Sequence, residues 1–302
     1  VNALVDGIEV PLPLNFNSIM LLFDKDKANK LIQSLLNEYG ENESVQILEL
    51  RKSNVPDLKA LADFVYEKIF LHYTTKMWGM SPTEISPSVT GRVPIRLSYD
   101  DRHFTHKYQV MPKFGYNKLF ENMLEHEKIE VRLNANASDY ISVDSKTGKI
   151  FFEGKPFSGR LIYTGSLDEL FSFCYGELPY RTLRFEHATY KRDEIQQTAV
   201  LNFPDSRPET RRTAMKKLTQ QKISGITSTL TEYPGAYLRG DSIWGEPYYP
   251  IINSEYLEIH KKYADLAKKI PNLYPVGRLA EYRYYNMEDT IKRGMETVEN
   301  MR

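Results

Sequence analysis

The spacing of apolar residues switches from a helical to a strand pattern near residue 140, and this switch limits the possible folds more than any other feature. Before it, apolar side chains recur three and four positions apart, as on one face of a helix. This spacing predicts helices over residues 24–40, 56–72 and 117–126. After it, short apolar runs between turn residues predict strands over 140–143, 149–152, 161–163, 183–190, 199–203 and 226–232. Helical spacing returns over 256–267 and 288–301.

The connections between the predicted strands indicate the class of sheet. An Asp6-Gly7 turn predicts a strand pair within residues 1–10, and residues 144–148 form the turn of a second hairpin. The strands are joined by loops rather than by regular crossover helices, which favours an antiparallel sheet. We therefore predict an α+β fold with a helical cluster inserted early in the chain.

The composition argues against several classes of protein. Lys and Arg together number 40 and Asp and Glu also number 40, so the chain has no basic surplus with which to bind nucleic acid. No apolar run approaches the ~20 residues of a membrane helix, and we expect a cytoplasmic protein without a membrane span. The single cysteine, Cys174, excludes a disulfide framework. Because it lies in an apolar aromatic run, we expect it to be buried.

The short motifs of several common catalytic sites are missing from the 302 residues. There is no G-x-S-x-G, no G-x-x-x-x-G-K-[ST] and no G-x-G-x-x-G. His103 and His106 lie close together, but no cysteine or carboxylate is spaced to complete a zinc site, so no metal is predicted. A bound nucleoside diphosphate would therefore be held by arginine side chains rather than by a glycine cradle.

Three stretches combine arginine with aromatic residues, at 73–101, 202–212 and 245–285. Guanidinium groups bind phosphate oxygens through paired hydrogen bonds, and aromatic faces stack on planar rings. An anionic nucleotide sugar would use both. Taken one at a time, each stretch fits solvated arginines beside core tyrosines at least as well.

Seven ordered motifs in these and neighbouring stretches resemble those of the UDP-galactopyranose mutase family. They include Y-T-x-K-x-W-G at 73–79, L-P-Y-R-x-L-R-F-E at 178–186 and G-R-L-A-E-Y-x-Y-Y-x-M at 277–287. The other four lie at 92–101, 108–124, 163–169 and 246–251. The resemblance covers essentially the whole chain.

The resemblance implies an α+β fold with an antiparallel sheet domain, an inserted helical substrate domain and the remnant of an α/β, Rossmann-like FAD-binding domain. Residues 1–22 are implied to form a strand pair and linker that join the sheet domain, which itself spans 171–275. The helical substrate-binding domain spans 23–125, with a mobile loop at about 86–95. The FAD-domain remnant spans 126–170, and a C-terminal FAD-domain segment spans 276–302. Family members begin with a G-x-G-x-x-G unit that holds the FAD pyrophosphate. We therefore expect this chain to start after that unit, to bind FAD weakly or not at all, and to be inactive alone.

The implied activity is that of an isomerase which interconverts UDP-galactopyranose and UDP-galactofuranose for cell-surface polysaccharide synthesis. In the family, N5 of reduced FAD attacks the anomeric carbon and forms a sugar–flavin adduct, while the protein supplies position and charge. The implied partners are UDP-galactose or UDP and a second copy in a homodimer. A non-catalytic UDP-sugar binding module stays open as an alternative. A glycosyltransferase that uses the same nucleotide sugar is disfavoured, because the Asp100-Asp101 dipeptide lies inside one of the mutase motifs.

Matching the motifs residue by residue gives the site that the resemblance implies. The catalytic residues are two diphosphate arginines, Arg92 on the mobile loop and Arg211. The substrate-binding residues are Tyr73, which stacks on uracil, and Thr74, Trp78, Tyr99, His103, Asn202, Tyr249, Tyr284 and Asn286. The flavin contacts are Thr164, Gly165, Gly277, Arg278 and Met287. Asn15 or Asn17 resembles an asparagine that faces the active site.

At three places the sequence departs from the family pattern. Asn286 stands where the family usually has Asp, and His103 stands where it has Tyr. Ala214-Met215 replaces a Glu-His pair that follows the second arginine. The first change removes a carboxylate near the sugar, and the second changes a phosphate or uracil contact.

Overall fold

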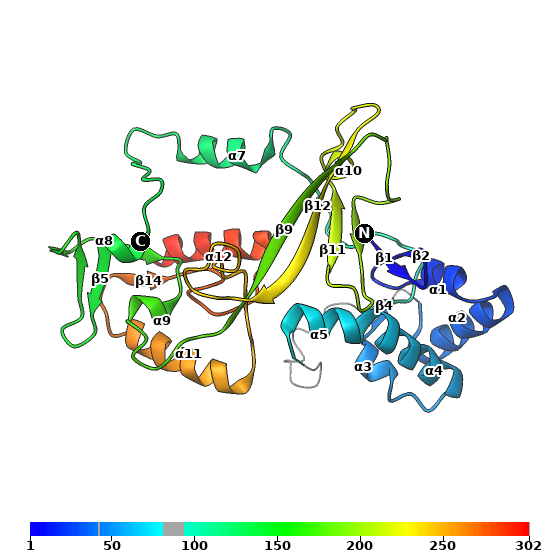
Figure 1. Ribbon diagram of the computed structural model, residues 1–302. Helices are drawn as coiled ribbons and strands as arrows, with labels where there is room; N and C mark the ends of the chain where they lie inside the picture. The colour runs from blue at the N-terminus through cyan, green and yellow to red at the C-terminus, as the bar shows by residue number, and fades with distance from the viewer. Residues whose placement is uncertain (42, 81–93, 302) are drawn as a thin grey trace. The chain divides into compact units, whose positions relative to one another are not determined.

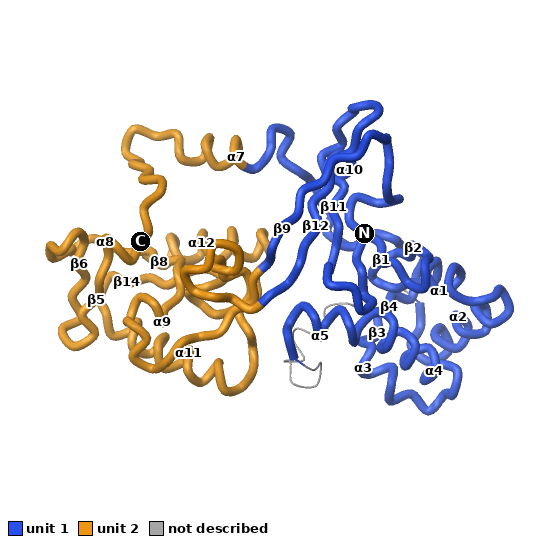
Figure 2. The backbone as a smooth tube through the Cα atoms, viewed as in Figure 1, with its two compact units in different colours: residues 1–116, 183–235 blue, residues 117–182, 236–302 orange. Residues whose placement is uncertain are grey.

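The computed structural model describes residues 1–41, 43–80 and 94–301, which fall into two compact units, each built from two separate stretches of chain (Figure 2). Unit 1 comprises residues 1–116 and 183–235, and unit 2 comprises residues 117–182 and 236–302. The domain boundaries implied by the resemblance stay a prediction. Across the described ranges, no helix has both the length and the apolar character required to span a bilayer.

The helices of unit 1 confirm the early helical pattern. Among the described residues they are α1 (Phe16–Leu22), α2 (Lys25–Tyr39), α3 (Ile47–Leu50), α4 (Pro56–Val65), the π-helix η1 (Tyr66–Leu71), α5 (His72–Trp78) and α10 (Met215–Thr219) (Figure 1). Helix α2 begins after Asp24, whose side chain accepts the N–H of Lys27, and ends at Gly40 in a positive-φ conformation. The helix predicted over 56–72 is longer than expected, because the π-turn η1 joins α4 to α5 and carries the helix to Trp78.

Unit 1 also holds most of a seven-stranded mixed sheet. Its strands are β1 (Asn2–Val5), β2 (Ile8–Pro11), β9 (Tyr180–Tyr190), β10 (Val200–Asn202), β11 (Arg211–Ala214) and β12 (Thr227–Ala236), in the order β9-β12-β11-β10-β1-β2. β1–β2, β10–β11 and β11–β12 are antiparallel as predicted, but β1 runs parallel to β10. The antiparallel prediction is wrong at this pair because β1 and β10 are far apart in sequence, so no hairpin turn reverses the chain between them. A short pair, β3 (Ser44–Val45) and β4 (Ile95–Arg96), completes the strands of this unit.

Apolar side chains from the strands and helices of unit 1 share one core. Val5 and Val10 of the β1–β2 pair belong to the same buried cluster as Ile19 of α1, Leu35 of α2 and Leu58 of α4. Burial of one such side chain contributes about 1.5–3 kcal/mol. This core holds the strands of the sheet edge against the helices that lead to α5.

Unit 2 combines two small sheets with short and long helices. The strands are β5 (Ile141–Asp144), β6 (Lys149–Phe152), β7 (Lys155–Phe157), β8 (Leu161–Tyr163), β13 (Tyr249–Pro250) and β14 (Leu273–Pro275). The helices are α7 (Gly115–Leu124), which begins at the unit boundary, α8 (Ala137–Tyr140), α9 (Leu167–Leu170), α11 (Ser254–Ala267) and α12 (Met287–Asn300). The predicted β5–β6 hairpin is confirmed, whereas β8 pairs in parallel with β14 and β13 pairs with the first residues of β9. The β8–β14 pair is a second correction to the antiparallel prediction.

Tyrosines form part of the core of unit 2. Tyr263 and Tyr282 are completely buried, together with neighbours such as Leu167. The prediction that Cys174 is buried is wrong, because its side chain is exposed. Ser172 and Phe173 adopt positive φ and turn the chain at the end of the apolar run, so its residues do not share one buried face.

Candidate functional site

Arg211, a predicted diphosphate ligand, is the first residue of β11 and has a paired residue on each side. It lies in register with Asn202 on β10 and with Glu232 on β12, so two predicted site residues face each other across strands. Its Nε is 2.6 Å from Oε2 of Glu232, whose side chain is only 8% exposed. The side-chain amide of Asn202 donates to the backbone oxygen of Asn2. A buried carboxylate therefore sets the direction of the Arg211 guanidinium through a charge-assisted bond.

Helix α5 carries three of the predicted substrate residues. Thr74 and Trp78, one turn apart, are buried, and Tyr73 is half-buried. The ammonium of Lys76, on the same helix, donates to backbone oxygens of the loop 203–209 that joins β10 to β11. Lys76 thus links the helix of these three residues to the loop between Asn202 and Arg211 within unit 1.

His103 is held beside the start of α1, and its surroundings favour the neutral imidazole. Its Nδ1 lies 3.1 Å from the backbone oxygen of Leu12. Burial lowers the pKa of His103 below its usual value, and the positive charges of Arg96 and Arg211 lower that pKa further. Because the ring N–H is used by the Leu12 carbonyl, the neutral imidazole offers a ligand one acceptor, at Nε2.

The asparagines near the start of α1 anchor the Tyr99-Asp100-Asp101 segment. The Asn15 amide donates to the backbone oxygen of Asp100 and to a carboxylate oxygen of Asp101. The Asn17 amide donates to the backbone oxygen of Tyr99 and to the same Asp101 oxygen. Tyr99 itself is 63% exposed. Both asparagines therefore position this segment, and their place facing an active site stays a prediction.

Arg92 and most of the predicted loop 86–95 lie outside the described residues. Of that loop, the structure describes only the end, where β4 pairs with β3. The role of Arg92 therefore stays a prediction.

In unit 2, two predicted tyrosines contact the guanidinium of a third predicted residue, Arg278. The rings of Tyr249 and Tyr284 are stacked, with centroids 5.7 Å apart and planes 8° from parallel. The Arg278 guanidinium carbon lies 5.1 Å from the centroid of each ring. Arg278 also donates to the backbone oxygens of Tyr248 and Tyr285. These contacts hold the guanidinium beside the stacked rings and against two carbonyl oxygens.

The predicted flavin contacts follow the ends of two adjacent parallel strands. Thr164-Gly165 comes directly after β8, and Gly277-Arg278 comes just after β14. Ligands of parallel sheets bind beyond the carboxyl ends of the strands. Gly277 has φ +98, a Cβ there would meet open space, and its N–H donates to the carboxylate of Glu281. The arrangement fits a planar group that approaches the backbone closely.

Asn286 and Met287 stand at the start of α12. The backbone N–H of Asn286 donates to Oδ2 of Asp289, and its carbonyl accepts from Thr290. Met287 is exposed. The hydrogen bonds of Asn286 cap the start of the helix. Binding of substrate by Asn286 and of flavin by Met287 stays a prediction.

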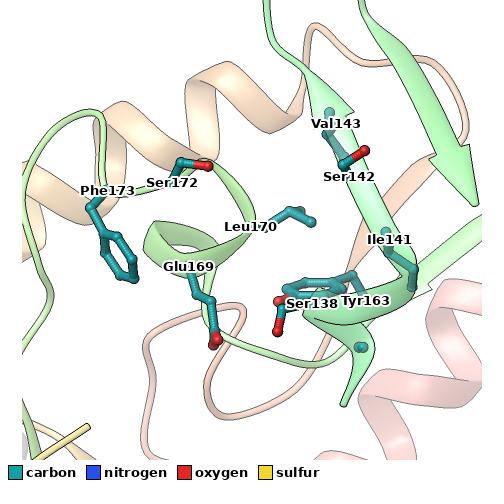
Figure 3. Close-up of a pocket in the computed structure, with 10 residues that line it drawn as sticks. Ser138, Ile141, Ser142, Val143, Tyr163, Glu169, Leu170, Ser172 and Phe173 are labelled. Carbon is teal, nitrogen blue, oxygen red and sulfur yellow. The ribbon is translucent and has the colours of Figure 1, made fainter. Parts of the chain in front are cut away.

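A cavity of about 350 Å³ lies between β5 and α9 in unit 2 (Figure 3). Its lining combines apolar side chains with hydroxyls and one carboxylate, including Ser142, Tyr163, Glu169 and Phe173. Burial raises the pKa of Tyr163 to about 12, which keeps the phenol neutral. The size and mixed lining are typical of small-molecule pockets. Because Tyr163 directly precedes Thr164, the cavity adjoins the predicted flavin segment.

Sequence reasoning missed two residues that organise unit 1, Lys76 and Glu232. Lys76 is the lysine of the Y-T-x-K-x-W-G motif at 73–79, so the sequence offered a signal: a charged side chain among predicted substrate residues needs a partner. Glu232 carried no such signal, because its pairing with Arg211 depends on the strand register.

Comparisons with known proteins agree with the motifs. The family model of UDP-galactopyranose mutase matches residues 68–284. The chain is 34% identical over 298 residues to the UDP-galactopyranose mutase of Mycoplasma pneumoniae, covering 98% of this chain and 74% of that protein. It is 33% identical over 290 residues to the enzyme of the same name from Mycoplasma genitalium, covering 95% and 71%. The dTDP-fucopyranose mutase of Escherichia coli is also 33% identical, over 286 residues, covering 94% and 72%.

A solved structure supports the fold. The chain matches a protein described as a protoporphyrinogen oxidase from Exiguobacterium sp. with a TM-score of 0.52 and 12% identity, covering 93% of this chain and 72% of that one. At this identity the match speaks for the fold alone. The family model matches more than half of the chain and the relatives match almost all of it, so the chain belongs to the UDP-galactopyranose mutase family.

Proposed function

We propose that this chain binds UDP-galactose and serves the interconversion of UDP-galactopyranose and UDP-galactofuranose with a bound flavin. Arg211 binds the diphosphate and Asn202 lies beside the nucleotide sugar. From α5, Tyr73 stacks on the uracil, while Thr74 and Trp78 border the substrate. The further proposed substrate contacts are Arg92, Tyr99, His103, Tyr249, Tyr284 and Asn286.

One observation carries this proposal. Arg211 is held by the buried Glu232, lies opposite Asn202 and is linked through the 203–209 loop to the helix of the aromatic residues. A guanidinium with a fixed direction recognises a diphosphate better than a mobile one, because less side-chain freedom is lost on binding. The relatives named for UDP-sugar chemistry support the same ligand.

The proposed cofactor is FAD, held by residues of unit 2. Thr164, Gly165, Gly277, Arg278 and Met287 would contact it at the ends of β8 and β14. When bound in its reduced form, the flavin would supply the nucleophile for the anomeric carbon. Because the 302 residues contain no glycine-rich pyrophosphate cradle, we expect this chain to bind FAD weakly. Titration of FAD, followed by quenching of its fluorescence, measures this affinity.

The protein's own contribution to the reaction is electrostatic and positional. Departure of UDP from the sugar develops negative charge on the diphosphate, and a preorganised guanidinium such as that of Arg211 stabilises this charge. Stacking of Tyr73 on the base and the neighbouring side chains of α5 would hold the sugar in place for attack. The neutral His103 would accept one hydrogen bond from the ligand at Nε2 without adding a charge, because its N–H is used by the Leu12 carbonyl.

Calorimetric titration with UDP tests the proposal directly. We expect saturable binding of UDP and weaker binding of UMP, because UMP lacks the second phosphate that a diphosphate arginine contacts. A parallel titration with dTDP tests whether the base pocket admits the methyl group of thymine, since one relative is named for a dTDP-sugar. The absence of heat with UDP at millimolar concentration would contradict the proposed function.

The alternative, a non-catalytic UDP-sugar binding module, is favoured by one feature. Ala214 is buried at the end of β11 and Met215 starts α10, where the family pattern has a Glu-His pair. A module would bind UDP as above but show no conversion of UDP-galactofuranose when supplied with reduced FAD. Turnover under these conditions would exclude the module.

A further inference from the structure

Four backbone oxygens of one loop converge on the ammonium of Lys76. They belong to Phe203 (2.5 Å from Nζ), Asp205 (3.0 Å), Arg207 (3.0 Å) and Glu209 (2.7 Å). These are alternate residues of a loop that bends at residues 205–208, and the bend turns their carbonyl oxygens toward one point. An ammonium has three hydrogens, so four acceptors share them. The loop is thus wrapped around a cation supplied by a helix 127 residues earlier in the chain than Phe203.

The loop joins the two strands that carry predicted substrate residues. Asn202 is the last residue of β10, and Arg211 is the first residue of β11. Between them, Phe203 N–H donates to the backbone oxygen of Thr210 and closes the loop. We propose that Lys76 is a positioning residue, whose ammonium organises the 203–209 loop and thereby places Asn202 and Arg211 against helix α5. This inference rests on the proposed function, in which these residues bind the nucleotide sugar.

The other contacts of the loop do not replace this link. Arg207 donates to the carboxylate of Asp205 and lies over the ring of Phe203, with 4.6 Å from guanidinium carbon to centroid. These contacts lie inside the loop, whereas Lys76 ties the loop to α5. Without a cation, the negative ends of four carbonyl dipoles would face one another and the loop would open.

The surroundings of the ammonium are those of a half-buried cation. Burial lowers the pKa of Lys76 to about 8, while Asp205 and Glu209 oppose this shift and Arg207 adds to it. The ammonium is therefore mostly charged at neutral pH and loses its third hydrogen within an accessible alkaline range.

A pair of matched variants tests the inference. Lys76→Met keeps most of the side-chain volume but removes the charge, and we expect UDP binding to weaken by about 10- to 100-fold because the diphosphate residues are displaced. Amide hydrogen exchange within 203–209 should accelerate. Lys68→Met is the control, since Lys68 lies two turns earlier and pairs only with the exposed Asp6 among its described contacts. It should leave UDP affinity and loop exchange unchanged.

Cation rescue separates this role from simple packing. Lys76→Ala leaves a space lined by four carbonyl oxygens, the kind of ligand set that also holds potassium ions. We expect methylammonium or potassium ions to restore UDP binding in Lys76→Ala in a concentration-dependent manner, with no effect on the wild type beyond ionic strength. Failure of both ions, together with unchanged loop exchange in Lys76→Met, would overturn the inference.

A pH series on the wild type tests the same inference without any substitution, so it stays valid if a variant fails to fold. Among the described residues, the charged groups that act on the Lys76 ammonium are Asp205 and Glu209, which raise its pKa, and Arg207, which lowers it. Raising the pH from about 7 to about 9, through the Lys76 pKa of about 8, removes its proton, so UDP affinity should fall in the wild type. An affinity that does not change would contradict the proposal.

The proposed function and the positioning role of Lys76 can fail separately. If the wild type does not bind UDP, the proposed function fails, and loop exchange in Lys76→Met against Lys68→Met still decides whether the ammonium organises the loop. If the wild type binds UDP and Lys76→Met binds it equally well, only the positioning role is wrong.

Discussion

Replacement of Arg211 by alanine is expected to weaken UDP binding by about 30- to 1,000-fold, equivalent to about 2–4 kcal/mol. The guanidinium is fixed by the buried Glu232 and lies in register with Asn202, so its removal takes away a preorganised charge next to the diphosphate. Arg211→Lys should recover only part of the affinity, because an ammonium cannot bind two phosphate oxygens with a planar fork. Isothermal titration calorimetry with UDP measures both variants.

Two controls keep this result interpretable. Arg212 is the next residue on β11, so its side chain leaves the other face of the sheet, where Nε donates to Gln196. Arg212→Ala should therefore bind UDP as the wild type does. Arg211→Ala also removes the ion-pair partner of the buried Glu232 carboxylate, which lowers the free energy of unfolding. The double variant Arg211→Ala/Glu232→Gln removes the stranded charge, and restored UDP binding in it would show that Arg211 acts only on the fold.

Replacement of Tyr282 by alanine is expected to destabilise unit 2 by about 3–5 kcal/mol, the usual cost of removing a large aromatic side chain from a core. The side chain is completely buried, and its hydroxyl lies 2.8 Å from the backbone oxygen of Pro179 and 2.9 Å from that of Ile251. The ring stacks on His260 and meets Tyr180 edge-on. Tyr282→Phe keeps the ring but loses the donor, so it should cost about 1–3 kcal/mol.

The two tryptophans allow this loss to be assigned to one unit. Trp78 lies in unit 1 and Trp244 in unit 2, so a Trp78→Phe background reports unfolding of unit 2 through Trp244 fluorescence in a denaturant series. Tyr108→Ala, at a side chain that is 77% exposed, should change the free energy of unfolding by less than about 0.5 kcal/mol. An equally small effect of Tyr282→Ala would contradict the core assignment.

Elements with local signals were predictable from the sequence. Asp24 and Gly40 mark both ends of α2, and the turn at 144–148 fixes the β5–β6 hairpin. The parallel pairing of β1 with β10 was not predictable, because it joins segments whose intervening chain contains no register signal. The exposure of Cys174 was missed because it depends on backbone angles rather than on hydrophobicity.

The candidate site also combines features that were predictable from the sequence with features that were not. The motifs named residues such as Arg211 and Tyr284, while the structure adds that Asn202 lies opposite Arg211 and that Tyr249 stacks on Tyr284; their ligand roles stay predictions. The partners that hold these residues are a carboxylate on a neighbouring strand and the carbonyls of a loop. Such partners are set by tertiary pairing, which a linear pattern does not encode.

The π-turn η1 determines which way the side chains of α5 face around the helix axis. One additional residue in a helical turn rotates every later side chain about the axis by ~100° relative to an uninterrupted α-helix. Tyr73, Lys76 and Trp78 all lie beyond this point, so their angular phase is set by the six residues Tyr66–Leu71 as much as by their own positions. Deletion of one residue from this segment would therefore turn the side chains of α5 toward other neighbours, while it shortens the helix by only ~1.5 Å.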